Sequence, residues 1–170
     1  AIKRMSTFNI TPPPSEMEKR DEVLAKAYSN LIYFGRAFLP NDFLKKSESA
    51  PFHYEMGQKM IDTAPGARIC NIIPRGHGKS VIAKAAIMHK LCFAADDQQH
   101  FIAWVSEEQS QAIDHLKYIR SHFENNKMIR YYFGNMDGGS VGKRWTEKDL
   151  VTPKGDRVIS KGTSQRLRGR

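Results

Sequence analysis

A glycine-rich loop between two regular segments restricts the fold of this chain more than any other feature. Residues 68–73 are mostly apolar and rich in isoleucine, and breakers bound them, which predicts a buried strand. The loop at residues 75–80 reads RGHGKS, and residues 81–94 then show the alanine-rich periodicity of a helix. A strand, a glycine loop and a helix in this order predict an α/β fold with a parallel sheet flanked by helices.

A loop of this kind is suited to the phosphates of a nucleotide. Glycines let backbone N–H groups approach a phosphate closely, and the start of the following helix favours negative charge. The usual pattern is G-x-x-x-x-G-K-[ST]. Its end is present as Gly78, Lys79 and Ser80, whereas Ile73 stands where the first glycine belongs. We therefore expect ATP and Mg²⁺ to bind here; the alternative is a tight turn that binds nothing.

Each position of the loop has an expected task. Lys79 neutralises charge on the transferred phosphoryl group, and Ser80 holds Mg²⁺. Arg75 is either a finger that reaches the γ-phosphate or an exposed arginine on the shoulder of the loop. The backbone N–H groups that surround the phosphate oxygens belong to Gly76, His77, Gly78, Lys79 and Ser80. We interpret the His77 side chain as a spacer and not as a phosphate contact.

The whole chain divides into three parts. Residues 1–14 form a leader that ends in Thr-Pro-Pro-Pro and is predicted to be flexible, residues 15–66 form a helical segment, and residues 67–170 form the nucleotide-binding core. Helices are predicted at residues 15–38, 51–63, 107–123 and 127–133, and strands at residues 100–105, 149–152 and 157–160. The Pro-Lys-Gly-Asp turn between the last two strands predicts a hairpin.

Two helix starts have a sequence signal. Ser15 and Glu18 match a capping box, which predicts the start of the first helix. Ser106 follows the strand at residues 100–105 and is predicted to be the N-cap of the next helix.

Charge and cysteine content limit the partners and the compartment. The formal net charge of +9 favours a polyanion, either nucleic acid or an anionic membrane, over a basic surface without a partner. A DNA-facing surface or an ordinary solvated face is possible at Lys117, Arg120, Lys127 and Arg130, with Tyr131 and Tyr132 nearby. No run of apolar residues reaches the ~20 of a membrane span. Cys70 and Cys92 are expected to be reduced core residues, as in a cytoplasmic protein.

Three segments together resemble the large terminase subunits of tailed bacteriophages. Residues 74–80 resemble the deviant Walker A motif of that family, which replaces the first glycine and carries an arginine where Arg75 stands. Residues 51–56 resemble the segment ahead of that motif, and His53 falls where the family places a glutamine or histidine near the adenine. Residues 162–170 resemble the basic loop with a Leu-Arg-Gly core that precedes Walker B.

The resemblance implies an ASCE-type P-loop ATPase that packages viral DNA. Such proteins form a homo-oligomeric ring in the host cytoplasm and use ATP hydrolysis to pump double-stranded DNA through the portal protein into a procapsid. A small terminase subunit is their partner, and a C-terminal nuclease domain cuts the genome. The arginine finger would be Arg75 within its own subunit, or Arg168 reaching the ATP of a neighbour.

The same resemblance would place Walker B beyond Arg170, so the core is expected to be truncated before it. Residues 91–97 are the one segment that could imitate Walker B, and they continue the helix after the glycine loop. The chain is therefore expected to bind nucleotide weakly without hydrolysing it at a motor-like rate. Two alternatives are another helicase-like P-loop ATPase and a non-enzymatic basic module whose loop grips nucleic-acid phosphate.

Overall fold

A computed structural model describes residues 14–43, 48–64 and 66–164, with side chains from residue 19 onward. Within these ranges the chain is mixed α/β, with seven α-helices, one 3₁₀-helix and three strands. The helices are α1 Pro14–Ser29, α2 Leu31–Phe38, α3 Pro40–Phe43, α4 Pro51–Ile61, α5 Lys79–Cys92, α6 Gln109–Asn125 and α7 Lys127–Phe133, with the 3₁₀ turn at Gly139–Val141. The strands are β1 Phe101–Ser106, β2 Asp149–Val151 and β3 Arg157–Gly162.

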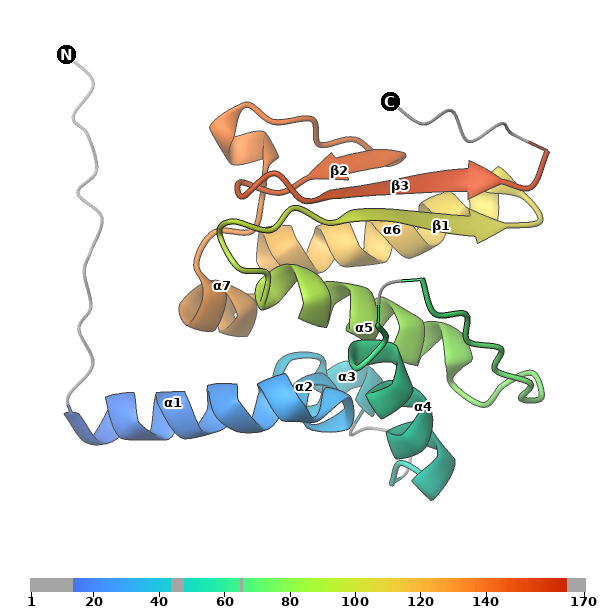
Figure 1. Cartoon of the computed structure of the whole chain (residues 1–170). Coiled ribbons are helices and arrows are strands. Elements are labelled where there is room, and N and C mark those ends of the chain that lie inside the picture. Colours follow the sequence, from blue (N-terminus) through green and yellow to red (C-terminus); the bar gives the residue numbers. More distant parts are fainter. Residues whose placement is uncertain (1–13, 44–47, 65, 165–170) are drawn as a thin grey trace, which may run out of the picture.

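The elements stack in layers, with the sheet at one side and the N-terminal helices at the other (Figure 1). Helix α6 packs on β1 and β3, and α5 lies between α6 and the pair α2 and α4. Because α5 is held on both sides, its first turn and the loop before it have a fixed support. The predicted leader at residues 1–14 lies outside the described residues, except for Pro14, where α1 begins.

The sheet is mixed and has the order β1-β3-β2. Strands β1 and β3 are parallel, and β2 and β3 are antiparallel, so the predicted hairpin is confirmed. On one face Trp104 stacks on His115 of α6, with ring centroids 4.3 Å apart. On the other face Phe101 and Val105 are exposed. In the described part of the chain the sheet is therefore not wholly parallel, and this face of β1 has no helix against it.

The strand predicted at residues 68–73 is not formed in this structure. The segment has no regular secondary structure and joins no ladder, and Ile72 is 92% exposed. Apolar β-branched residues favour a strand only where a neighbouring strand takes up their backbone N–H and C=O groups. No strand lies beside this segment among the residues described. The prediction of a buried strand was wrong here, because a segment with the composition of a strand still needs a neighbouring strand to pair with.

Two helix boundaries also differ from the predictions. The first predicted helix is divided at Asn30, whose side chain accepts a 3.0 Å hydrogen bond from the Tyr33 N–H and so caps α2. The predicted N-cap Ser106 remains in β1, where its carbonyl accepts the Thr163 N–H, and Glu108 precedes α6 instead. The side chains of the predicted capping box, Ser15 and Glu18, lie outside the described side chains.

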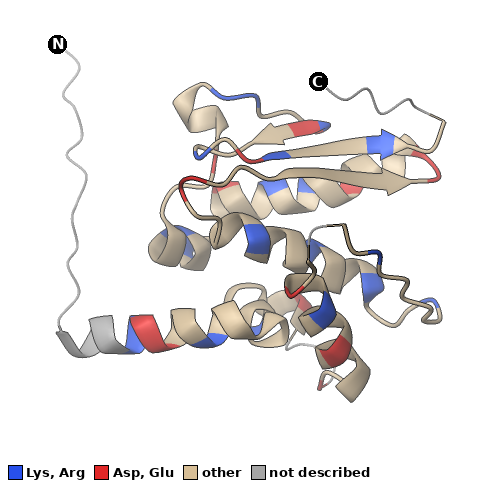
Figure 2. Cartoon of the chain, in the orientation of Figure 1, with Lys and Arg blue, Asp and Glu red and all other residues tan. Residues whose placement is uncertain are grey.

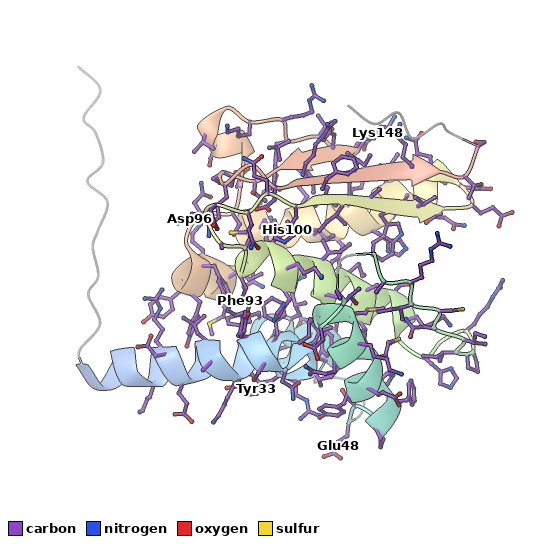
Figure 3. All side chains as sticks on the ribbon, viewed as in Figure 1. Tyr33, Glu48, Phe93, Asp96, His100 and Lys148 are labelled. Atoms are coloured by element: carbon purple, nitrogen blue, oxygen red, sulfur yellow. The ribbon has the colours of Figure 1, made fainter. Side chains whose placement is uncertain are left out.

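An aromatic cluster joins the N-terminal helices to α5 and α7. Phe34 of α2 is fully buried, and its ring centroid lies 5.0 Å from that of Phe38 and 6.2 Å from that of Phe93. Phe93 follows α5 and lies between it and the N-terminal helices (Figure 3), with the Phe133 ring 5.0 Å away. His89 adds a polar link, because its Nε2 lies 3.1 and 3.0 Å from the carbonyl oxygens of Ala27 and Tyr28.

The free energy of unfolding is expected to fall as the pH drops below the ordinary histidine pKa of 6.5. Burial lowers the pKa of His89, His115 and His122 in the folded chain. The unfolded chain therefore binds protons that the folded chain excludes, so the stabilisation present above pH 6.5 is lost as the pH falls through the lowered pKa values. The urea midpoint at about pH 7.5 and 5.5 measures this difference. The difference between the two midpoints should be smaller in His89→Gln, which keeps an N–H donor without titrating. Equal midpoints at the two pH values in the wild-type chain would contradict the prediction.

Candidate nucleotide-binding site

The glycine loop forms a turn at residues 75–76 and a bend at residues 77–78, which lead directly into α5. Gly76 and Gly78 have φ angles of +82° and +75°, a left-handed backbone that residues with a Cβ atom rarely adopt. Gly78 is also the N-cap of α5, and its carbonyl accepts a 3.0 Å hydrogen bond from the Ile82 N–H. These two glycines are thus required by the shape of the loop, and they leave its backbone open at the positive end of the helix.

Lys79 folds back over the loop. Its ammonium group donates hydrogen bonds to the carbonyl oxygen of Ile73 and, at 2.7 Å, to that of Pro74. Lysine has three N–H donors and no acceptor, so carbonyl oxygens satisfy it when no anion is nearby. The side chain is therefore held at the mouth of the loop, where a phosphate oxygen can replace a carbonyl as its acceptor.

His53 connects α4 to the glycine loop. Its Nδ1 accepts a 3.0 Å hydrogen bond from the Ala50 N–H, and its Nε2 lies 3.1 Å from the His77 carbonyl oxygen. Of these two bonds, only the one from the Ala50 N–H to the His53 side chain belongs to a capping box. The reciprocal bond of such a box is missing, because Ala50 has no side-chain acceptor. Phe52 packs against the imidazole, with ring centroids 4.1 Å apart. The structure thus brings His53 to the loop, although residues 53 and 77 are distant in the sequence.

A cavity of about 700 Å³ opens beside the loop. This volume is in the range of pockets that hold small ligands. Ile32, Phe43 and Phe52 give its lining an apolar part, and Arg75, Lys79 and Ser80 add positive charge and a hydroxyl group. A ligand with a flat apolar part and an anionic part would match this lining.

Asp42 and Glu48 also line the cavity, and Asp42 has a side-chain partner on α6. Tyr118 of α6 donates a hydrogen bond to the Asp42 carboxylate, and Lys84 Nζ lies 3.7 Å from the centre of the Tyr118 ring. Burial raises the pKa of Tyr118, and burial lowers that of Lys84. The cluster ties α3, α5 and α6 together behind the cavity. Sequence reasoning missed it because its members are spread over 76 positions.

The remaining predicted site residues have different outcomes. Arg75 is exposed and borders the cavity. Arg168 lies outside the described residues, so the choice between the two proposed fingers stays open. Ser80 is exposed on the first turn of α5. Over residues 14–43, 48–64 and 66–164 no group of three or more His, Cys, Asp or Glu side chains is placed to hold a metal ion. The Mg²⁺ contact of Ser80 stays a prediction.

The basic surface suggested by the sequence separates into two parts. Lys117 lies 3.4 Å from Glu147, and Arg120 lies 2.7 Å from Glu124, so acidic partners offset both charges. Lys127 and Arg130 on α7 are exposed and make no ion pair within the described part. Lys and Arg residues are scattered over helices, strands and loops (Figure 2).

Two smaller expectations are also settled. Cys92 is buried, and burial raises the pKa of its thiol, as expected for an inert core residue. Cys70 is exposed, so its assignment to the core was wrong. It belongs to the segment at residues 68–73, which pairs with no strand among the described residues. None of the helices described here combines the length and the apolar composition needed to cross a membrane.

Comparison with protein-family models, with curated proteins and with solved structures gives no match to this chain.

Proposed function

We propose that the glycine loop binds the phosphates of ATP with Mg²⁺, and that the chain is the ATP-binding part of a DNA-packaging ATPase of the large-terminase kind. One observation carries the proposal. Lys79 and two left-handed glycines stand at the start of the 14-residue helix α5 and face a cavity of about 700 Å³. The geometry supports phosphate binding, and the packaging role rests on the sequence resemblance.

The residues of the loop divide the work of binding between them. The N–H groups before and within the first turn of α5 have no intrahelical acceptor, so they can donate to phosphate oxygens. Lys79 would exchange its bonds to the Ile73 and Pro74 carbonyls for charge-assisted bonds to the phosphates. Ser80 would offer its hydroxyl to Mg²⁺, which in such sites is held mainly by phosphate oxygens and water. Arg75 would add a second cation to the cavity lining.

The apolar wall of the cavity suits a nucleobase. Ile32 and Phe43 are buried, and Phe52 is half-buried. An aromatic or aliphatic surface covers the face of a base and excludes water from it, whereas the triphosphate stays with the cations. The mixed lining of the cavity therefore matches ATP, which has an apolar base and an anionic triphosphate, better than it matches a repeating nucleic-acid backbone.

At the level of the assembly, the proposal is a ring of subunits that couples ATP hydrolysis to movement of double-stranded DNA. The net charge of +9 supports a polyanionic partner of this kind. Portal protein and small terminase subunit would be its protein partners. A helicase-like P-loop ATPase shares the same loop chemistry, so the loop alone does not separate the two.

Calorimetric titration with ATP and Mg²⁺ tests the proposed binding. We expect one saturable site per chain, weakened when Mg²⁺ is chelated and competed by inorganic triphosphate. A short DNA duplex should not compete with ATP, because the proposed site binds an anion at the glycine loop and not the extended backbone of a nucleic-acid strand. A folded chain that binds the duplex but ignores ATP and Mg²⁺ would instead indicate a nucleic-acid-binding module.

A further inference from the structure

We propose that His53 is a positioning residue that holds the glycine loop in its phosphate-binding shape and reads no base. The inference rests on the proposed function, since it assigns a task to a residue of the same site. It differs from the role that the resemblance implies, in which this position lies near the adenine. The resulting site selects the polyphosphate chain, and His53 contributes nothing to the choice of base.

Both ring nitrogens of His53 are already engaged. The Ala50 backbone N–H can only donate, so Nδ1 must be its acceptor. The His77 carbonyl can only accept, so Nε2 must carry the proton and donate to it. One neutral tautomer, with the proton on Nε2, satisfies both bonds. In this arrangement the ring has no donor or acceptor left for the edge of a base.

The bond to His77 fixes the orientation of one peptide group in the loop. In a trans peptide the carbonyl and the N–H point in opposite directions. His53 draws the His77 carbonyl toward α4, so the N–H of Gly78 must point away from α4. Gly78 is left-handed and close to the ring, since a Cβ atom on it would lie 3.5 Å from His53 Nε2. A glycine allows this peptide to rotate at little cost, so the loop needs an external bond to hold it.

The support is itself well anchored. Helix α4 packs on α2 and α5, and the Phe52 ring lies 4.1 Å from the imidazole, centroid to centroid. A shift of the imidazole would therefore disturb both the start of α4 and the loop. Loss of the bond to His77 should lower affinity for every ligand that places a phosphate in the loop, whatever its base.

Two isosteric variants separate the two bonds. The amide of asparagine occupies the place of Nδ1, so His53→Asn keeps an acceptor for Ala50 and loses the bond to the loop. The amide nitrogen of glutamine occupies the place of Nε2, so His53→Gln keeps a donor to His77 and loses the cap. Each variant loses one neutral hydrogen bond, so their folding stabilities should be matched and are checked by urea unfolding.

The probes are ATP, GTP and inorganic triphosphate, each with Mg²⁺, titrated calorimetrically. We expect His53→Asn to weaken all three by the same factor, about three- to tenfold, and His53→Gln to stay within about twofold of the wild-type chain. Nitrogen-15 NMR of the free wild-type protein should show the Nε2–H tautomer at His53, a result that does not depend on ligand.

Three outcomes would overturn the proposal. A loss confined to ATP in His53→Asn, with triphosphate unaffected, would show that His53 reads the base. A loss in His53→Gln, with His53→Asn unaffected, would show that the cap of α4, and not the bond to the loop, is what matters. If the folded wild-type chain binds neither ATP nor triphosphate, the proposed function itself fails, and the positioning role fails with it.

Discussion

Replacing Lys79 by alanine should weaken the binding of ATP with Mg²⁺ by about ten- to a hundredfold, which corresponds to the loss of charge-assisted hydrogen bonds to phosphate. In the structure its ammonium group already points at the mouth of the loop, bonded to the Ile73 and Pro74 carbonyls. Alanine removes the cation that faces the phosphates and also frees the two carbonyls, whose dipoles repel an anion. Both changes act in the same direction.

Calorimetry of Lys79→Ala beside Lys90→Ala is the appropriate comparison. Lys90 lies in the last turn of the same helix, so this control removes the same charge at the far end of α5. We expect its affinity to stay within about twofold of the wild-type value, since a charge at the far end of the 14-residue helix lies beyond the distance at which salt screens charges. Equal affinities in Lys79→Ala and the wild-type chain would mean that the loop does not bind phosphate.

Replacing Phe34 by alanine should lower the free energy of unfolding by about 3–5 kcal/mol. The ring is fully buried, and it contacts the rings of Phe38 and His89 at 5.0 and 5.3 Å between centroids. A cavity would remain where α2 packs on α5, since the surrounding helices can close only part of the space. The loss is a large share of the ~5–15 kcal/mol that folded domains of this size usually possess.

Phe101→Ala is the matched control for this substitution. It deletes the same ring from a site that is 62% exposed, on the open face of β1. The change there should stay below about 1 kcal/mol, although the ring lies 5.8 Å from the Arg157 guanidinium. Urea unfolding of both variants measures the difference. Similar destabilisation at the two sites would show that the aromatic cluster does not bind the N-terminal helices to α5.

Local patterns predicted most elements of the fold. The periodicity of residues 81–94 and 127–133 predicted α5 and α7, and the Pro-Lys-Gly-Asp turn predicted the β2–β3 hairpin with its antiparallel pairing. These signals are strong because the hydrogen bonds of a helix or a short hairpin join residues that are close in the sequence. Residues 100–105 were also identified correctly as a strand, with a shift of one residue.

Predictions that depended on a distant partner were less successful. Residues 68–73 have the composition of a strand, but no neighbouring strand in the described structure takes up their hydrogen bonds. Ser106 has the right side chain for an N-cap, but pairing with Gly162 keeps it in β1. At Asn30 a local cap divides a helix whose apolar spacing continues without interruption. In each case a contact or a cap had more influence than the spacing of apolar residues.

The sequence alone determined the nucleotide-binding hypothesis, because the loop requires glycine, lysine and serine at adjacent positions, and these can be recognised without a structure. Only the tertiary structure decided what surrounds the loop. It placed both nitrogens of His53 on backbone groups and the apolar wall of Ile32 and Phe43 beside the loop. It also joined Asp42 to Tyr118 behind the cavity. The physical reason is that a phosphate loop is built from consecutive backbone groups, whereas its supports come from helices that meet only when the chain packs.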